Sequence, residues 1–159
     1  GGHEALLSKG TQLEVGDIIC DAELVNIADI SNAILTSRLS TARKQRSVRG
    51  VFVSLRELTW ESVPASLKNY KGSLRFQEYK DAYDLINING VGEGAMNVCG
   101  EEGDIQAGDY ICSSSMRGKG MRQPDQSCEK PYTFAQARHD VTFTSPDEIK
   151  QIAVIYLRG

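Results

Sequence analysis

The sequence predicts a mainly β fold: a compact β-barrel or sandwich-like single domain with one irregular insertion and little helix. Short apolar runs recur along the 159 residues, and turns rich in glycine, aspartate and serine separate them. Runs with helical periodicity are scarce, so strands are the expected elements. The length, with 40% hydrophobic and 25% charged residues, suits one globular domain that buries its core without disulfides or metal ions. We therefore treat residues 1–159 as a single β-rich domain.

The segment from Gly92 to Gln123 has the densest alternation of apolar runs and turns. Ala95–Cys99 predicts a short strand, and the Gly-Glu-Glu-Gly-Asp sequence after it supplies residues that tolerate a positive φ or bond to their own backbone. Tyr110–Cys112 is a second apolar run, which ends at three serines. We expect two strands and two turns in this segment.

Part of this pattern occurs earlier in the chain. Residues 13–20, Leu-Glu-Val-Gly-Asp-Ile-Ile-Cys, align without a gap with residues 105–112, Ile-Gln-Ala-Gly-Asp-Tyr-Ile-Cys. The match places a glycine-aspartate pair in the turn before each apolar run: Gly16, Asp17, Gly108 and Asp109. Glycine permits the turn and the aspartate carboxylate accepts nearby backbone N–H groups, so the repeat predicts two related corners in one β fold. Two copies are too few for a solenoid or a propeller.

The first third of the chain has weaker patterns. We expect residues 1–10 to be loosely ordered and residues 11–29 to hold two strands that form a hairpin. Residues 37–50 contain five basic residues and predict a solvated loop, with a polyanion contact as the alternative. Val48–Leu55 is the clearest strand here, and Gly50 within it predicts a bulge or a close approach of two backbones.

Residues 59–84 differ in composition from the rest of the chain, because aromatic residues are scattered among charged ones, and they predict an insertion. A short helix is expected over Leu74–Ala82. The aromatic residues have two open interpretations: they line a surface that binds a receptor or a glycan, or they pin the insertion onto the wall of the barrel. The candidate binding residues are Trp60, Tyr70 and Tyr79.

Three further strands are expected after the insertion: Tyr83–Ile88, most of Tyr132–Phe143, and Ile149–Leu157. The four cysteines form no Cys-x-x-Cys pair and lie far from histidines, so we predict no metal site and no cofactor. Most of them fall in apolar strands, which favours buried reduced thiols over disulfides.

The sequence offers three arrangements that could carry chemistry, and none is strong. Glu101, Glu102 and Asp104 could bind a calcium ion, but the required loop register is absent and a solvated turn is the simpler interpretation. A serine among Ser113, Ser114 and Ser115 paired with Lys119 would be the dyad of some self-cleaving β-proteins, although a polar glycine-rich loop is expected to leave that lysine solvated. Asp17 and Asp109, in turn, would form an acid dyad only if they shared a proton, and turn capping explains both more simply.

Several motifs of the chain also resemble a known group of proteins. These motifs are residues 92–100, 103–115, 118–121, 132–137 and 152–159, and the likeness is weakest in the insertion. Together they resemble the C-terminal β-domains of tail fibres, tail spikes and neck appendages of phages and large viruses. The resemblance implies a homotrimeric component of the virion, assembled in the host cytoplasm. Some similar domains are intramolecular chaperones that trimerise a fibre and then cleave themselves off.

We therefore expect a module that promotes trimerisation and folding of its own fibre chain or forms the fibre tip. The alternatives are an autoproteolytic chaperone with a nucleophile in the Ser113–Lys119 loop, and a tip domain that binds a host receptor or glycan through the insertion. We predict no activity on an external substrate. The net charge of −3 gives no reason to expect nucleic acid, and no apolar run is long enough to span a membrane.

Overall fold

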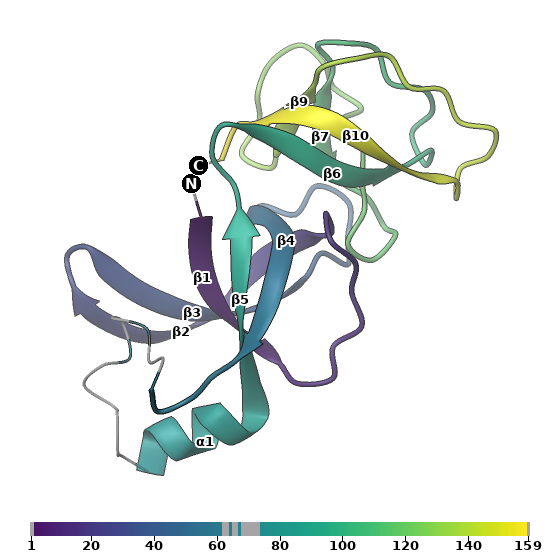
Figure 1. Cartoon of the computed structure of the whole chain (residues 1–159). Coiled ribbons are helices and arrows are strands. Elements are labelled where there is room, and N and C mark those ends of the chain that lie inside the picture. Colours follow the sequence, from purple (N-terminus) through teal and green to yellow (C-terminus); the bar gives the residue numbers. More distant parts are fainter. Residues whose placement is uncertain (1, 62–63, 65–66, 68–73, 159) are drawn as a thin grey trace.

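The chain folds into two closed five-stranded β-barrels, one after the other along the sequence (Figure 1). The computed structural model describes residues 2–61, 64, 67 and 74–158. The strands of the first barrel are β1 (Gly2–Ser8), β2 (Ile18–Asp29), β3 (Asn32–Leu39), β4 (Val48–Glu57) and β5 (Tyr83–Asn89). Those of the second are β6 (Glu93–Cys99), β7 (Tyr110–Ser113), β8 (Gly120–Arg122), β9 (Ala135–Ala137) and β10 (Ile149–Tyr156). One helix, α1 (Leu74–Ala82), precedes β5. Strands make up 49% and helix 6%, so the predicted mainly β, barrel-like fold with little helix is confirmed.

The two barrels have the same strand topology. In the first, β1 pairs in parallel with β3, and the pairs β1–β5, β2–β3, β2–β4 and β4–β5 are antiparallel. In the second, β6 pairs in parallel with β8, and the pairs β6–β10, β7–β8, β7–β9 and β9–β10 are antiparallel. Taken in chain order, β1–β5 therefore correspond to β6–β10 in every pairing. The repeated sequence leads into β2 and into β7, which are corresponding strands, and this confirms the two related corners.

One hydrophobic cluster is shared by the barrels. Ile18, Cys20, Val48 and Val51 of the first barrel belong to the same buried cluster as core residues of the second, among them Phe134. Burial of this apolar surface stabilises both barrels at once. That the whole chain is one domain stays a prediction, and this shared core supports it.

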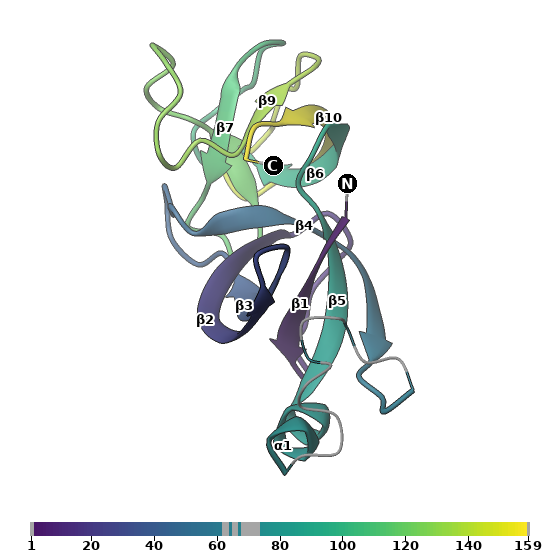
Figure 2. The same cartoon turned by 90° about the vertical axis from the view of Figure 1, so that its left-hand side faces the viewer.

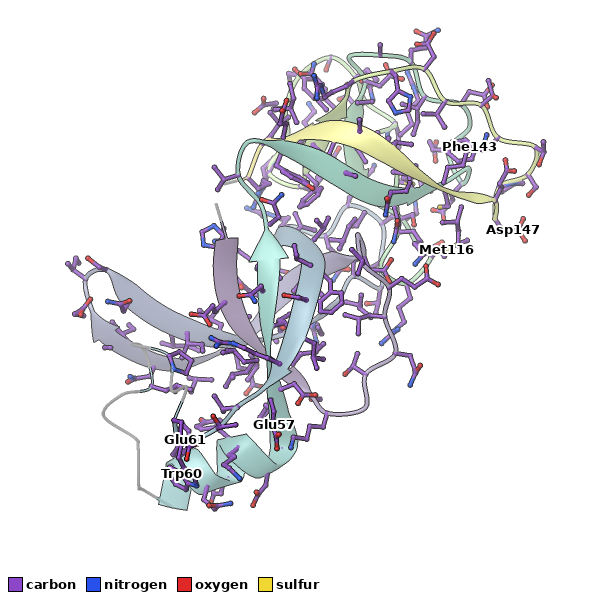
Figure 3. All side chains as sticks on the ribbon, in the orientation of Figure 1. Glu57, Trp60, Glu61, Met116, Phe143 and Asp147 are labelled. Atoms are coloured by element: carbon purple, nitrogen blue, oxygen red, sulfur yellow. The ribbon has the colours of Figure 1, made fainter. Side chains whose placement is uncertain are left out.

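Backbone hydrogen bonds also join the barrels. Asn97 N donates to Gly16 O at 2.9 Å, and Ile18 N donates to Gly118 O at 2.8 Å. Gly118 N in turn donates to Ser40 O at 2.9 Å. The loop between β7 and β8, which carries Met116, lies between the two barrels (Figure 3). The barrels are thus joined through main-chain groups as well as through side chains.

The hairpin of β2 and β3 extends beyond the first barrel. Strand β2 pairs with β4 only over Ile18–Cys20, and β3 pairs with β1 only at Thr36 and Ser37. We call residues 22–35, which pair only with one another, the arm. The arm projects away from the barrel on the left of Figure 1, and Figure 2 shows the same hairpin from that side.

Three expectations for the strands are wrong. Residues 1–10 were expected to be loosely ordered, but the described residues 2–8 form β1, which pairs with β5 along its whole length and buries Leu6 and Leu7. Residues 11–29 hold one strand, β2, which forms its hairpin with the later β3. The strand expected over Tyr132–Phe143 is only Ala135–Ala137, because turns and loop contacts satisfy the flanking backbone.

Other expectations are confirmed. The strands predicted in Val48–Leu55, Tyr83–Ile88 and Ile149–Leu157 correspond to β4, β5 and β10, and the helix has the predicted bounds. The register shifts by one residue beside Gly50, where an added Cβ would lie 2.7 Å from Asn89 O, so the predicted bulge and close approach are both present. The helix is too short to cross a membrane, and no other described segment offers a membrane-spanning helix.

Candidate functional site

The two glycine-aspartate corners have the same local geometry. Gly16 has φ 95° and Gly108 has φ 91°, both in the left-handed region that favours glycine. Asp17 Oδ2 accepts a hydrogen bond from Glu14 N at 2.9 Å, and Asp109 Oδ2 accepts one from Gln106 N at 2.8 Å. Each aspartate therefore closes the turn three residues before it, in the way that the sequence pattern indicates.

The surroundings of the two carboxylates differ. Asp17 and Lys119 are 3% and 6% exposed, and Lys119 Nζ donates to Asp17 Oδ1 at 2.5 Å. Asn97 Nδ2 donates to the same oxygen at 2.8 Å. Asp109 pairs with Arg122 instead, at 3.1 Å and nearer the surface. Asp17 and Asp109 lie at two separate corners, and each is paired with its own basic residue. The two carboxylates are not neighbours, so they cannot share a proton as an acid dyad would.

The three serines and Lys119 lie in one stretch, the end of β7 and the loop after it, but the serine hydroxyls do not bond to the Lys119 side chain. Ser113 Oγ donates to Ala42 O at 2.8 Å, Ser114 Oγ donates to Lys119 O at 2.7 Å, and Ser115 Oγ donates to Glu101. Ser113 and Ser114 are fully buried. Among the described residues, no hydrogen bond joins Lys119 Nζ to a serine hydroxyl.

The interpretation of Lys119 as a solvated side chain is wrong. Its loop folds over the Asp17 corner of the first barrel, which removes the ammonium group from water and pairs it with a carboxylate. The arrangement resembles a buried ion pair that joins two parts of a fold rather than a general base beside a nucleophile.

The described aromatic residues of the insertion pack against the first barrel. The ring centroids of Trp60 and Phe76 are 4.6 Å apart, and those of Tyr79 and Tyr83 are 5.9 Å apart. Phe76 is fully buried in a cluster with strand residues, and Figure 3 shows Trp60 beside helix α1. These contacts support pinning of the insertion onto the barrel. Tyr70 lies outside the described residues.

The arm has an exposed apolar face that was not predicted from the sequence. Leu24, Ile27 and Ile30 are 57%, 64% and 104% exposed, whereas Val25 and Ile34 are buried against the insertion. A signal was present in the sequence, because neighbouring residues of a strand point to opposite faces. Leu24 and Val25 cannot both face the core of one barrel.

A cavity of about 280 Å³ lies between the arm and β1, where β1 and β3 separate before their short parallel pairing. Its aliphatic lining comes from Ala5, Ala33, Leu35 and Ile88. We call this cavity the groove.

Four ionisable groups line the groove: His3, Glu4, Asp21 and Arg49. Glu4 is already paired, because Arg56 Nη2 lies 2.7 Å from Glu4 Oε2. The Nε2 atom of His3 is buried and has no hydrogen-bond partner among the residues that the structure describes. Burial, and next Arg49, lower the pKa of His3, so its ring is neutral at pH 7. Burial raises the pKa of Asp21, and Arg49 Nε lies 3.8 Å from Asp21 Oδ2, which leaves the guanidinium loosely paired.

The cysteines are free, as expected. Cys20, Cys99 and Cys112 are buried and Cys128 is exposed. Burial raises the pKa of Cys20 and of Cys112 to about 11, so neither is a thiolate near neutral pH. Within the described ranges, no group of three or more His, Cys, Asp and Glu side chains is placed to hold a metal ion.

No protein-family model matches the chain, and no curated protein is significantly similar to it.

Proposed function

We propose that this chain is a self-associating structural module of a viral fibre, spike or appendage, which promotes trimerisation and folding or forms the tip. The single observation that supports this most is the arm with its three exposed aliphatic side chains. A two-stranded ribbon is marginally stable by itself in water, so an arm with an apolar outer face favours a partner.

Burial of that face would supply free energy for association. Fully burying one leucine or isoleucine side chain contributes about 1.5–3 kcal/mol, and each chain offers three on the arm. In a long fibre the chains must also be aligned, and a compact terminal module that associates first offsets part of that entropy. The resemblance to terminal domains of viral fibres supplies the expected number of three copies.

The arrangement of Ser113, Ser114, Ser115 and Lys119 favours a structural role over self-cleavage. The serine hydroxyls are engaged in loop contacts and the lysine is paired with Asp17. A serine nucleophile would need a base within hydrogen-bond reach. We therefore propose structure, rather than catalysis, as the role of this loop.

The test is the solution mass of the chain, measured by light scattering from about 1 to 100 µM. The expected result is a particle of three times 17.5 kDa that persists on dilution. A mass of 17.5 kDa over the whole range would contradict the proposal, because the described chain would then leave its apolar arm exposed.

A further inference from the structure

We propose that the tip of the arm of one copy docks into the groove of a second copy, with Ile30 and Ile27 entering between the arm and β1. This inference rests on the proposed function, because it requires self-association, and it specifies the surface that performs it. The occupant of the groove is therefore a second copy of this chain.

The apolar parts of the two surfaces match. Ile30 stands at the turn between β2 and β3 with its side chain 104% exposed, and Ile27 precedes it at 64%. The groove offers aliphatic side chains, Ala5, Leu35 and Ile88, in a cavity of about 280 Å³. Aliphatic groups that enter such a cavity leave water and bring no polar atom of their own into it.

The polar parts also match. The turn at the arm tip carries Asp29, which is exposed and whose carboxylate accepts hydrogen bonds from Ser31 N and Asn32 Nδ2. A carboxylate has further acceptor sites for a second set of donors. The groove supplies those donors in Arg49, whose own contacts to Arg158 O and Asp21 Oδ2 are long, at 3.4 and 3.8 Å, and in His3, whose buried Nε2 has no partner among the described residues. Docking would thus place the Asp29 carboxylate beside the Arg49 guanidinium and the His3 ring, which have hydrogen-bonding capacity left in the single chain.

The side chains that dock, Ile27, Asp29 and Ile30, are not among those that line the groove, although Ser31 and Asn32 of the same turn are. A contact of these three residues with the groove of another copy is therefore heterologous. A heterologous contact passes from copy to copy and either closes into a ring or continues as a filament. Under the proposed function the ring closes at three copies, and each copy both inserts an arm and receives one.

The first experiment compares the same substitution at two exposed isoleucines. Ile30→Asp at the arm tip is expected to weaken association at least tenfold, measured as the concentration at which the oligomer dissociates in light scattering. Ile155→Asp on β10 is the matched control, because Ile155 is 42% exposed on the other barrel, and it is expected to leave association unchanged. Both positions are exposed, so both variants are expected to fold, which circular dichroism checks.

The second experiment swaps charges. Asp29→Arg alone and Arg49→Asp alone are each expected to weaken association, and the double variant is expected to restore a substantial part of it. The double variant keeps the net charge of the chain, so its recovery reports the contact rather than general repulsion.

The outcomes separate the two proposals. An oligomer whose dissociation Ile30→Asp does not change, with no recovery in the charge swap, would overturn the docking of the arm and leave the self-associating module intact. A wild-type chain that is monomeric throughout would overturn both. Loss of association in Ile30→Asp but not in Ile155→Asp, with recovery in the charge swap, supports both.

Discussion

The two barrels share one strand order but differ in what is added to it. The second barrel is close to the bare topology, with β8 and β9 of only three residues each. The first has a twelve-residue β2, the projecting arm, and the helical insertion before β5 (Figure 1). The arm and the helical insertion both lie on the first barrel. Under the proposed function, the surface for association therefore belongs to the first barrel.

The two corners differ in the same way at the level of single residues. Each has a left-handed glycine and an aspartate that closes the turn, yet Asp17 is buried in an ion pair and Asp109 lies near the surface. The difference comes from position, since the second barrel covers the corner of the first. The same local motif is thus expected to contribute more to the free energy of unfolding in the first barrel than in the second.

The largest expected effect is for the aspartates. Asp17→Ala leaves the buried Lys119 ammonium with only the exposed Glu14 carboxylate, 3.7 Å away, and should destabilise the fold by about 3 kcal/mol. Asp109→Ala removes a turn contact and a partly exposed ion pair and should cost about 1 kcal/mol. Urea unfolding of the two variants measures both losses.

A control addresses the ion pair itself. The double variant Asp17→Leu with Lys119→Met removes both charges and should recover part of the stability lost in Asp17→Ala. Equal losses for Asp17→Ala and Asp109→Ala would show that the two corners are equivalent in energy as well as in shape.

A smaller difference in lost stability is expected between alanine variants of Gly16 and Gly108. Alanine at Gly108 meets no heavy atom within 4 Å, so only the left-handed backbone is penalised, by about 1–2 kcal/mol. Alanine at Gly16 bears the same backbone penalty, and its Cβ would lie 2.9 Å from Asn97 Oδ1 of the second barrel, which adds about 1–3 kcal/mol. Thermal unfolding of both variants measures the difference, and a Gly108→Ala loss as large as that of Gly16→Ala would contradict the close packing of the junction.

The smallest difference is expected in the rate at which each barrel opens and exposes its buried cysteine. Cys20 and Cys112 occupy matching positions, and both are buried with a pKa of about 11. A thiol reagent at pH 8 should label Cys128 at once and should label Cys20 and Cys112 slowly. Equal rates are expected for these two, because Cys20 and Ile111, the neighbour of Cys112, belong to one shared core that should open as a unit. Mass spectrometry of digested samples over time resolves the sites. Unequal rates would mean that one barrel opens without the other.

Strong local patterns account for the parts of the fold that the sequence predicted. Apolar runs with clear ends marked β4, β5 and β10, and the repeated Gly-Asp turn marked the two corners. Strand β1 was missed because its order comes from pairing with β5, about 80 residues later. A residue's own neighbours in the sequence carry no record of such a pairing.

The burial of Lys119 and the exposed face of the arm were missed for the same physical reason. Burial of Lys119 depends on Asp17, which lies 102 residues earlier, so a glycine-rich loop alone indicated a solvated side chain. The exposed face of the arm was missed because Leu24 and Ile27 are of the type expected in a core. The sequence does not show where the hairpin leaves the barrel. The structure does, because the pairing of β2 with β4 ends at Cys20.

The junction between the barrels has a consequence for how freely each can vary. Several of its bonds join main-chain groups, such as Asn97 N to Gly16 O and Ile18 N to Gly118 O. Every residue except proline supplies these groups, so most side chains can be exchanged without loss of the bonds. Two copies of one topology can in this way keep their mutual placement while their sequences drift apart, until a single turn is the last passage that still matches.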